Sequence, residues 1–196
     1  VCSSDLDKNC FLMTELYELT MANGLYMSGK AEEIAYFDLF FRKVPDNGGF
    51  AIFSGLSRIV ELIKNIKFSE SDLEYLSSIG LCDGFVDYLR NFKFECDVWS
   101  VPEGTPVFPN EPVIKVRGPI LQAQLIETLL LVCMNHQSLI ATKANRLVRA
   151  AKGTAVAEFG TRRAIGYDSA FMALVLHISA VASALQVLFR VKSSVF

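Results

Sequence analysis

The stretch Thr154-Ala155-Val156-Ala157-Glu158-Phe159-Gly160-Thr161-Arg162-Arg163-Ala164 joins a short apolar run to a turn that carries two adjacent arginines. The apolar run predicts a buried β-strand over Ala155–Phe159. Because this strand follows a long helical stretch, and other strand-like runs lie nearer the start of the chain, the sequence predicts a mixed α/β fold.

The residues of this turn suit a flat anionic ligand. The guanidinium groups of Arg162 and Arg163 can bind phosphate or carboxylate through paired hydrogen bonds. Gly160 would let a ligand approach the backbone closely, and the ring of Phe159 offers a stacking face. The alternative is that the two arginines only keep a strand end in contact with water.

Four segments before residue 95 carry helical signals, either apolar residues at helical spacing or a capping pattern. The predicted helices span 12–27, 56–66, 69–76 and 84–92. Thr14 is the expected N-cap of the first helix, and Ser69 with Asp72 forms a capping signal for the third.

Short runs rich in aromatic and β-branched residues predict the strands 34–41, 50–53, 96–100, 106–108 and 113–117. The turn-forming residues 45–49 suggest that the first two strands make a hairpin. A long helical pattern covers 119–134 and 138–152, with a junction expected near Asn135. Gly153 is the expected end of the second helix.

Composition excludes several function classes. The 196-residue chain has a formal net charge of −2 and its basic residues are dispersed, so it gives no electrostatic case for nucleic acid or an anionic membrane. Its five cysteines are odd in number and lack CxxC spacing, which favours reduced thiols in a cytoplasmic protein. Neither His136 nor His177 stands at zinc-ligand spacing from a cysteine.

Several further blocks extend the pattern of Glu158–Ala164. In chain order they are 13–21, 37–45, 48–56, 102–105, 118–120, 127–128 and 138–143. In this order and spacing the blocks resemble nicotinate phosphoribosyltransferase over residues 11–173. Any one block is weakly specific, whereas the ordered series is highly specific.

The resemblance implies a type II phosphoribosyltransferase-like architecture. An open-faced α/β sandwich would occupy 11–117, and linking helices with the first strand of an irregular α/β barrel would occupy 118–173. The strand Ala155–Phe159 would be that first barrel strand, and most of the barrel would be missing. Arg162 and Arg163 would then follow the carboxyl end of a barrel strand, where catalytic residues of barrels gather.

The resemblance also implies how rings and cations bind the substrates. Tyr17 and Phe159 match positions whose rings sandwich the pyridine of nicotinate, and Tyr17 would come from the partner subunit of a homodimer. The alternative for Tyr17 is an ordinary helix-face residue packed in the core.

Arg162 and Arg163 would contact the nicotinate carboxylate and the phosphates of phosphoribosyl pyrophosphate. Arg42 and Lys43 would cover the pyrophosphate from the other subunit. The alternative for Arg42 and Lys43 is a basic strand end that keeps a sheet edge soluble.

The implied reaction forms nicotinate mononucleotide and pyrophosphate in NAD salvage, with Mg²⁺ and with ATP hydrolysis through a phosphorylated histidine. Neither His136 nor His177 stands in the expected histidine motif, so the catalytic residue is absent from this chain. The chain also carries no predicted metal ligands. We therefore expect it to be inactive alone.

Both ends of the chain look foreign to this pattern. Residues 1–10 are expected to be an artefactual or disordered leader. Residues 174–196 are apolar, and Ala170–Phe189 has the length of a membrane-spanning helix. An out-of-frame tail after Ala173 ranks above such an anchor, because codons allowed there can also encode the family's next segment.

Other functions stay open at this stage. A related phosphoribosyltransferase could use nicotinamide or quinolinate, although the paired arginines favour a substrate that carries a carboxylate. The chain could also be a truncated, non-enzymatic subunit that still dimerises, or a membrane-tethered module.

Overall fold

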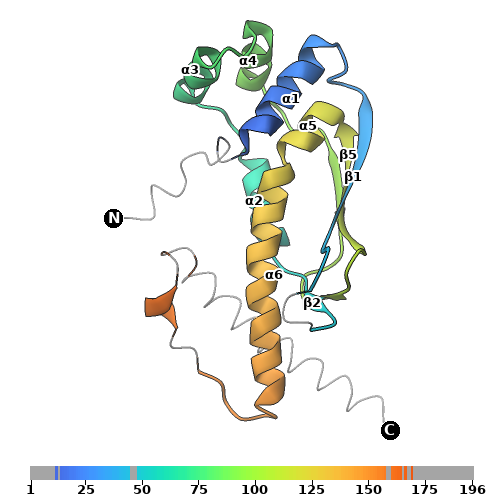
Figure 1. Cartoon of the computed structure of the whole chain (residues 1–196), viewed down its shortest axis with the longest axis vertical. Helices are drawn as coiled ribbons and strands as arrows, with labels where there is room; N and C mark the ends of the chain where they lie inside the picture. The colour runs from blue at the N-terminus through green and yellow to red at the C-terminus, as the bar shows by residue number, and fades with distance from the viewer. Residues whose placement is uncertain are drawn as a thin grey trace. The chain divides into compact units, whose positions relative to one another are not determined.

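The computed structural model of the chain describes residues 12, 14–44, 48–157, 160–164, 166 and 169. These residues form α-helices and two small sheets (Figure 1), so the predicted α/β class is confirmed. The chain divides into two compact units. The first comprises Val1–Leu39, Ser57–Ser100 and Ile114–Val132, and the second Phe40–Leu56, Val101–Val113 and Cys133–Phe196. The expected boundary near residue 117 stays a prediction.

Helices build the core of the first unit. They are α1 (Leu16–Met27), α3 (Glu70–Ser78), α4 (Asp83–Arg90) and the short α5 (Ile120–Leu125). Helix α1 packs against α4 and α5, and α3 packs against α4. Their buried side chains form one apolar cluster: Leu19, Ala22, Ala31, Leu73, Leu76, Leu81, Phe85, Val86, Leu89, Leu121 and Leu125. Removal of this apolar surface from water is the main force that holds the helices together.

The start of α3 confirms the predicted capping signal. The Ser69 hydroxyl accepts a hydrogen bond from the Asp72 backbone N–H at 3.2 Å, and the Asp72 carboxylate accepts one from the Ser69 N–H at 2.8 Å. This reciprocal pair satisfies two backbone donors. The helices predicted at 56–66 and 84–92 are confirmed as α2 (Leu56–Lys64) and α4.

The start of α1 differs from the prediction. The helix begins at Leu16 rather than at residue 12, and Glu15 occupies the N-cap position. The hydroxyl of Thr14, the expected cap, donates instead to the carboxylate of Glu18. Because a long-range anchor for Glu18 competes for this hydroxyl, the local capping rule fails here.

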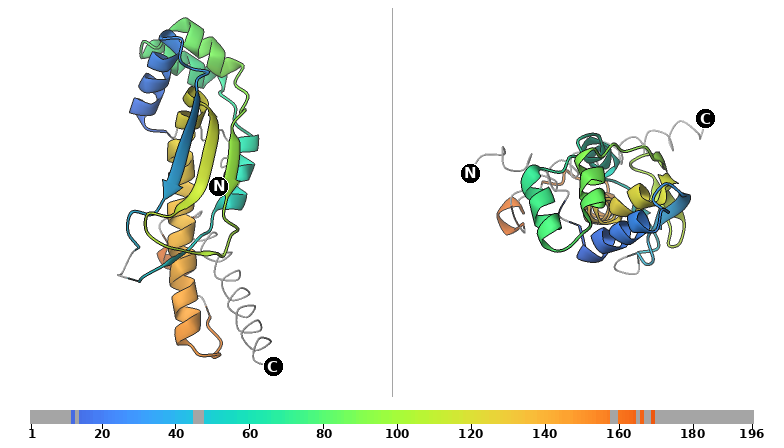
Figure 2. Two further views of the ribbon diagram at one scale, coloured as in Figure 1. Left: turned by 90° about the vertical axis from the view of Figure 1, so that its right-hand side faces the viewer. Right: turned by 90° about the horizontal axis from the view of Figure 1, so that it is seen from above.

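The larger sheet has the strand order β1-β5-β3, with β1 (Ile34–Phe40), β3 (Asp97–Ser100) and β5 (Pro112–Pro119). Figure 2 shows β1 and β5 side by side as long strands. Strands β3 and β5 are antiparallel, with Trp99 opposite Lys115. These strands confirm the predictions for 34–41, 96–100 and 113–117.

Polar side chains link the three strands of this sheet. Arg117 donates to the Tyr36 hydroxyl at 3.0 Å and to the Asp97 carboxylate at 3.1 Å, and Lys115 forms an ion pair with Asp38 at 3.2 Å. All five side chains are at least partly exposed, so each pair adds little stability. Together they connect β1, β5 and β3 across the exposed face of the sheet.

The second unit contains a small antiparallel sheet, and the predicted hairpin is wrong. Strand β2 (Ala51–Ile52) pairs with β4 (Pro106–Val107) instead of β1. The reason lies in helix α6 (Glu127–Ala150). Its Thr142 hydroxyl accepts from the Ile52 N–H at 2.8 Å, and its Ser138 hydroxyl accepts from the Ser54 N–H at 3.0 Å.

Gly55 lets α6 approach this segment closely. Its φ of +110° is strained for residues with a side chain, and a Cβ atom placed there would lie 2.9 Å from the Cys133 carbonyl oxygen. The contact is made by backbone, which cannot simply rotate away. Glycine is therefore required both by conformation and by space.

The long helical pattern breaks at a different residue from the one predicted. Helix α5 ends at Leu125, Ile126 is a turn, and α6 then continues without interruption past Asn135. Downstream, Lys152 and Gly153 adopt φ values of 48° and 92°. The predicted end of the helix at this glycine is thus confirmed, with the left-handed turn beginning one residue earlier.

The predicted buried strand over Ala155–Phe159 is wrong in its described part. Residues 155–157 have no strand conformation, and Ala155 and Ala157 are exposed. Strands form only as parts of sheets, and both sheets in the described ranges are built from residues before 120. Residues 158 and 159 lie outside the described residues.

The predictions for both ends of the chain, the leader 1–10 and the tail 174–196, concern residues outside the described ranges. Among the residues described, one helical segment, Ile120–Ala150, is long and apolar enough to cross a membrane by length and composition alone. Of its most apolar window, 44% is buried inside the protein, and the core helix of a soluble protein can pass the same test of length and composition.

Candidate functional site

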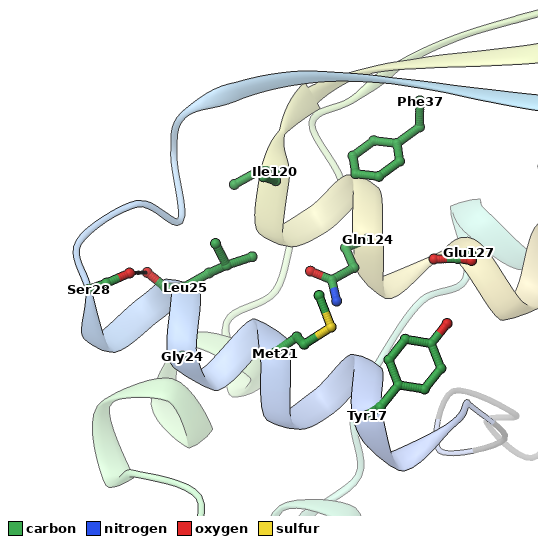
Figure 3. A pocket seen from close by; sticks show the side chains of 9 residues that line it. All are labelled: Tyr17, Met21, Gly24, Leu25, Ser28, Phe37, Ile120, Gln124 and Glu127. Atoms are coloured by element: carbon green, nitrogen blue, oxygen red, sulfur yellow. Dashed lines mark hydrogen bonds between the residues drawn. The ribbon is translucent and has the colours of Figure 1, made fainter.

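Tyr17 lines a cavity of about 390 Å³ in the first unit (Figure 3). The cavity walls come from α1, β1, α5 and the first residue of α6. The lining residues are Tyr17, Met21, Gly24, Leu25, Ser28, Phe37, Ile120, Gln124 and Glu127. The Tyr17 side chain is 44% exposed, so its ring is available to a ligand and is not a core residue.

The residue after Tyr17 anchors this turn of α1. Glu18 is fully buried, and one oxygen of its carboxylate accepts hydrogen bonds from the Thr128 backbone N–H at 3.2 Å and the Thr128 hydroxyl at 2.8 Å. The other oxygen accepts the hydroxyl of Thr14. The carboxylate thereby caps the N-terminus of α6, where an unpaired N–H and the helix dipole favour negative charge.

The anchor fixes the direction of Tyr17. Neighbouring residues on a helix point to different faces. Because the side chain of Glu18 is buried against α6, the side chain of Tyr17 faces the cavity. The side chains of Thr14 and Glu18 thus hold the first turn of α1 in place, and this turn presents the ring of Tyr17 at the surface.

Carboxylates shape the electrostatics around Tyr17. Partial loss of solvent raises the pKa of the Tyr17 phenol, and the charges of Glu127 and Glu18 raise it further. Burial raises the pKa of the Glu18 carboxyl, while the hydrogen bond from the Thr128 hydroxyl acts in the opposite direction. This end of the cavity is therefore electronegative.

The predicted cationic residues lie in the second unit. Arg42 and Lys43 follow β1 after the buried Phe41, and both are exposed. Arg162 and Arg163 are exposed in a short 3₁₀ turn, Thr161–Arg163, closed by a hydrogen bond from the Arg163 N–H to the Gly160 carbonyl at 2.7 Å.

The predicted site is thus only partly described. Tyr17 belongs to the first unit and the four cationic residues to the second, while Phe159 lies outside the described residues. The exposure of the cations suits ligand binding and equally suits solvation. Their assembly with Tyr17 into one site stays a prediction.

Sequence reasoning missed Gln124 and Glu127 as cavity residues. Glu127 lies in a quoted sequence block, so a signal was present, but Gln124 carries no motif. Its role became visible only through the packing of α5 against α1.

The expected Mg²⁺ finds no ready ligand set in the described ranges. No group of three or more histidine, cysteine, aspartate or glutamate side chains there could hold a metal ion. His136, which we expected to be structural, is half-buried, and its Nε2 lies 3.3 Å from the Ser169 hydroxyl. These residues therefore do not form a metal centre.

Comparison with known families gives a match over most of the described chain. Residues 12–135 match the family of the nicotinate phosphoribosyltransferase (NAPRTase) N-terminal domain. The chain is 44% identical over 160 residues to a nicotinate phosphoribosyltransferase of Mycobacterium tuberculosis, covering 81% of this chain and 34% of that protein. It is also 44% identical over 165 residues to the Bacillus subtilis enzyme, covering 84% and 34%.

Solved structures give the same result. Human nicotinic acid phosphoribosyltransferase matches with a TM-score of 0.78 and 36% identity, over 85% of this chain and 34% of that one. Nicotinate-nucleotide pyrophosphorylase from Pyrococcus furiosus matches with a TM-score of 0.64, 22% identity and coverages of 88% and 38%, which supports the fold alone. The chain spans about a third of the length of the curated relatives it matches.

Proposed function

The chain belongs to the nicotinate phosphoribosyltransferase family, and on this premise we propose that it takes part in phosphoribosyl transfer to nicotinate. The substrates are nicotinate and phosphoribosyl pyrophosphate. The products are nicotinate mononucleotide and pyrophosphate, in the salvage route to NAD. A cytoplasmic location belongs to the same proposal.

The chemistry is a displacement at the anomeric carbon of the ribose. The pyridine nitrogen forms a bond to that carbon while the bond to pyrophosphate breaks. Positive charge develops on the sugar and negative charge on the leaving group, so the protein's task is to position the reactants and to neutralise charge.

In this proposal, different residues of the chain position the reactants and neutralise the charge. Tyr17, exposed on α1, offers a face on which the pyridine ring stacks. In the proposed homodimer this ring serves the partner subunit's site, and Phe159 supplies the opposite face.

The cations serve the anionic parts of the substrates. Arg162 and Arg163 bind the nicotinate carboxylate and the phosphates. Arg42 and Lys43 cover the pyrophosphate. Mg²⁺ would help to hold pyrophosphate, and ATP hydrolysis would drive the reaction, but neither is assigned to residues of this chain.

One observation carries the proposal more than any other. The family match includes Tyr17, Glu18 and Thr128. The contact of Glu18 with Thr128 buries Glu18, and the ring of Tyr17 is left exposed at a cavity. A tyrosine that served only the core would be buried, whereas this one is held at the surface by a dedicated anchor.

A chimera tests the proposal. Residues 12–164 of this chain replace the matching segment of the Bacillus subtilis relative, and the gene is introduced into cells that depend on nicotinate for NAD. We expect growth on nicotinate. A chimera that is folded and abundant but cannot support growth would refute the proposal.

A further inference from the structure

Successive turns of α6 hold the segment 48–54 in the second unit. The contacts run in opposite chain directions, with Ser138 at Ser54, Thr142 at Ile52 and Arg149 at Phe50. The first two are hydrogen bonds from backbone N–H groups, at 3.0 Å and 2.8 Å, and the third places a guanidinium over an aromatic ring, 6.0 Å from its centroid. Because both backbone and side chain are held, α6 fixes the course of this segment.

A fourth contact, at the start of the segment, uses the space beside a glycine. The guanidinium of Arg146 occupies the position that a Cβ atom of residue 48 would take. Gly48 does not have a left-handed φ, unlike its neighbour Gly49 at +76°. The backbone conformation at residue 48 therefore tolerates other amino acids. Glycine matters there because it leaves room for the guanidinium.

This contact lies just after the cations that we propose for pyrophosphate. Arg42 and Lys43 stand between two fixed points of the chain. Before them, Phe41 is 5% exposed and its carbonyl accepts a backbone hydrogen bond at 2.8 Å. After them, Arg146 covers Gly48. A binding segment held on both sides loses less conformational freedom when a ligand orders it, so the two cations are preorganised for an anion.

The charge of the second unit suits the same kind of ligand. Cations outnumber anions among its described side chains, with Arg42, Lys43, Lys143, Arg146, Arg149, Lys152, Arg162 and Arg163 against Glu103 and Glu111. Like charges gathered in one compact unit repel one another, and an anionic ligand relieves that repulsion.

We propose that Arg146 is a positioning residue for the binding of pyrophosphate. Its guanidinium, placed beside Gly48, holds the segment that follows Arg42 and Lys43, so that these two cations meet the pyrophosphate group of phosphoribosyl pyrophosphate in a fixed place. Arg146 acts through this segment and not by contact with the substrate. The inference rests on the proposed function, in which Arg42 and Lys43 cover that group.

Steady-state kinetics of the chimera with the Bacillus subtilis relative test the inference. Gly48→Ala keeps the charge of Arg146 but displaces its guanidinium, and because that group is the flexible end of a side chain, the thermal midpoint should change little. We expect the Michaelis constant for phosphoribosyl pyrophosphate to rise about tenfold while that for nicotinate stays within about twofold. Equal rises in both constants, or no rise in either, would overturn the inference.

Arg146→Met provides a second variant, which removes the guanidinium and keeps an unbranched apolar side chain. It should reproduce the same difference between the two Michaelis constants. Lys143→Met is the matched control, because Lys143 is an exposed cation of the same helix. If Lys143→Met raised the constant for phosphoribosyl pyrophosphate as much as Arg146→Met, net charge and not the contact with Gly48 would be responsible, and the inference would be overturned.

Loss of Arg42 and Lys43 separates positioning from a purely structural role. In a chimera that carries both Arg42→Met and Lys43→Met, the further change Arg146→Met should alter the constant for phosphoribosyl pyrophosphate by less than about twofold, because residues that act through one another are not additive. An undiminished effect would overturn the inference. A folded chimera that is inactive before any of these changes refutes the proposed function instead, so the two failures are distinguished.

Discussion

Replacement of Glu18 by alanine should destabilise the chain more than any surface change. The carboxylate is fully buried and accepts three hydrogen bonds, from the Thr14 hydroxyl and from the N–H and hydroxyl of Thr128. The variant leaves these donors without their acceptor and removes the cap of α6.

The magnitude follows from these contacts. Loss of a helix cap costs about 1 kcal/mol, and each hydrogen bond to a charged group contributes about 1.5–3 kcal/mol. Release of the carboxylate from its buried position offsets part of this sum. We expect the free energy of unfolding to fall by about 2–3 kcal/mol for Glu18→Ala, and by less for Glu18→Gln, which keeps one acceptor oxygen.

Urea unfolding followed by circular dichroism at pH 7 measures these differences. Glu74→Ala is the control, because Glu74 is an exposed residue of α3 and its loss should change stability by less than about 0.5 kcal/mol. If Glu18→Ala were as stable as the control, the anchoring of α6 by Glu18 would be refuted.

The pH dependence of the same variants gives a second check. Burial raises the pKa of Glu18 above its ordinary value of 4.5, so the folded state binds this proton more tightly than the unfolded state. The contribution of Glu18 to stability is therefore full below pH 4.5 and declines as pH rises through the folded-state pKa. The stability difference between the unaltered chain and Glu18→Gln should shrink from pH 4 to pH 7, and a growing difference would contradict this sign.

Three further predictions concern stability and reactivity. Gly55→Ala should lower the free energy of unfolding by about 2 kcal/mol or more, because the new Cβ meets the Cys133 carbonyl at a positive φ; a change below 0.5 kcal/mol in a urea melt would count against the close approach. Ser69→Ala should cost about 1 kcal/mol by the same assay through loss of the α3 capping pair, and an unchanged midpoint would contradict this. Burial raises the pKa of the Cys96 thiol to about 11, so at pH 8 only about 0.1% is thiolate; labelling by a disulfide reagent should accelerate about tenfold for each pH unit, and a rate independent of pH would contradict the shift.

The sequence predicted those elements whose signals are local. The capping box at Ser69 and Asp72 fixed the start of α3 almost to the residue, and the left-handed glycine at Gly153 marked the end of α6. Strand content was also visible from aromatic and β-branched runs. These signals depend on a few neighbouring residues and not on the rest of the chain.

Errors arose where distant residues decide the outcome. Thr14 failed as a cap because Glu18, anchored by Thr128 far along the chain, takes its hydroxyl. Strand β2 failed to pair with β1 because the Thr142 hydroxyl binds the backbone of Ile52 in β2 and the Ser138 hydroxyl binds the backbone of Ser54 just beyond it. No local pattern encodes such contacts.

The same contrast between local signals and distant contacts applies to the residues of the candidate site. Tyr17 was selected through the family resemblance, and its exposure at a cavity agrees with a binding role without testing it. Gln124 could not be selected, because its place on the cavity wall is a result of packing and carries no sequence motif. The roles of Arg42, Lys43, Arg162, Arg163 and Phe159 stay predictions.

The measurement that tests the central claim most directly is the Michaelis constant for nicotinate in the purified chimera with the Bacillus subtilis relative. Loss of ring stacking in Tyr17→Ala should raise it about tenfold, which corresponds to about 1.4 kcal/mol of binding. Tyr17→Phe, which keeps the ring, should stay within about twofold of the unaltered chimera. If Tyr17→Ala bound nicotinate as well as the unaltered chimera, this segment would not present Tyr17 to the substrate.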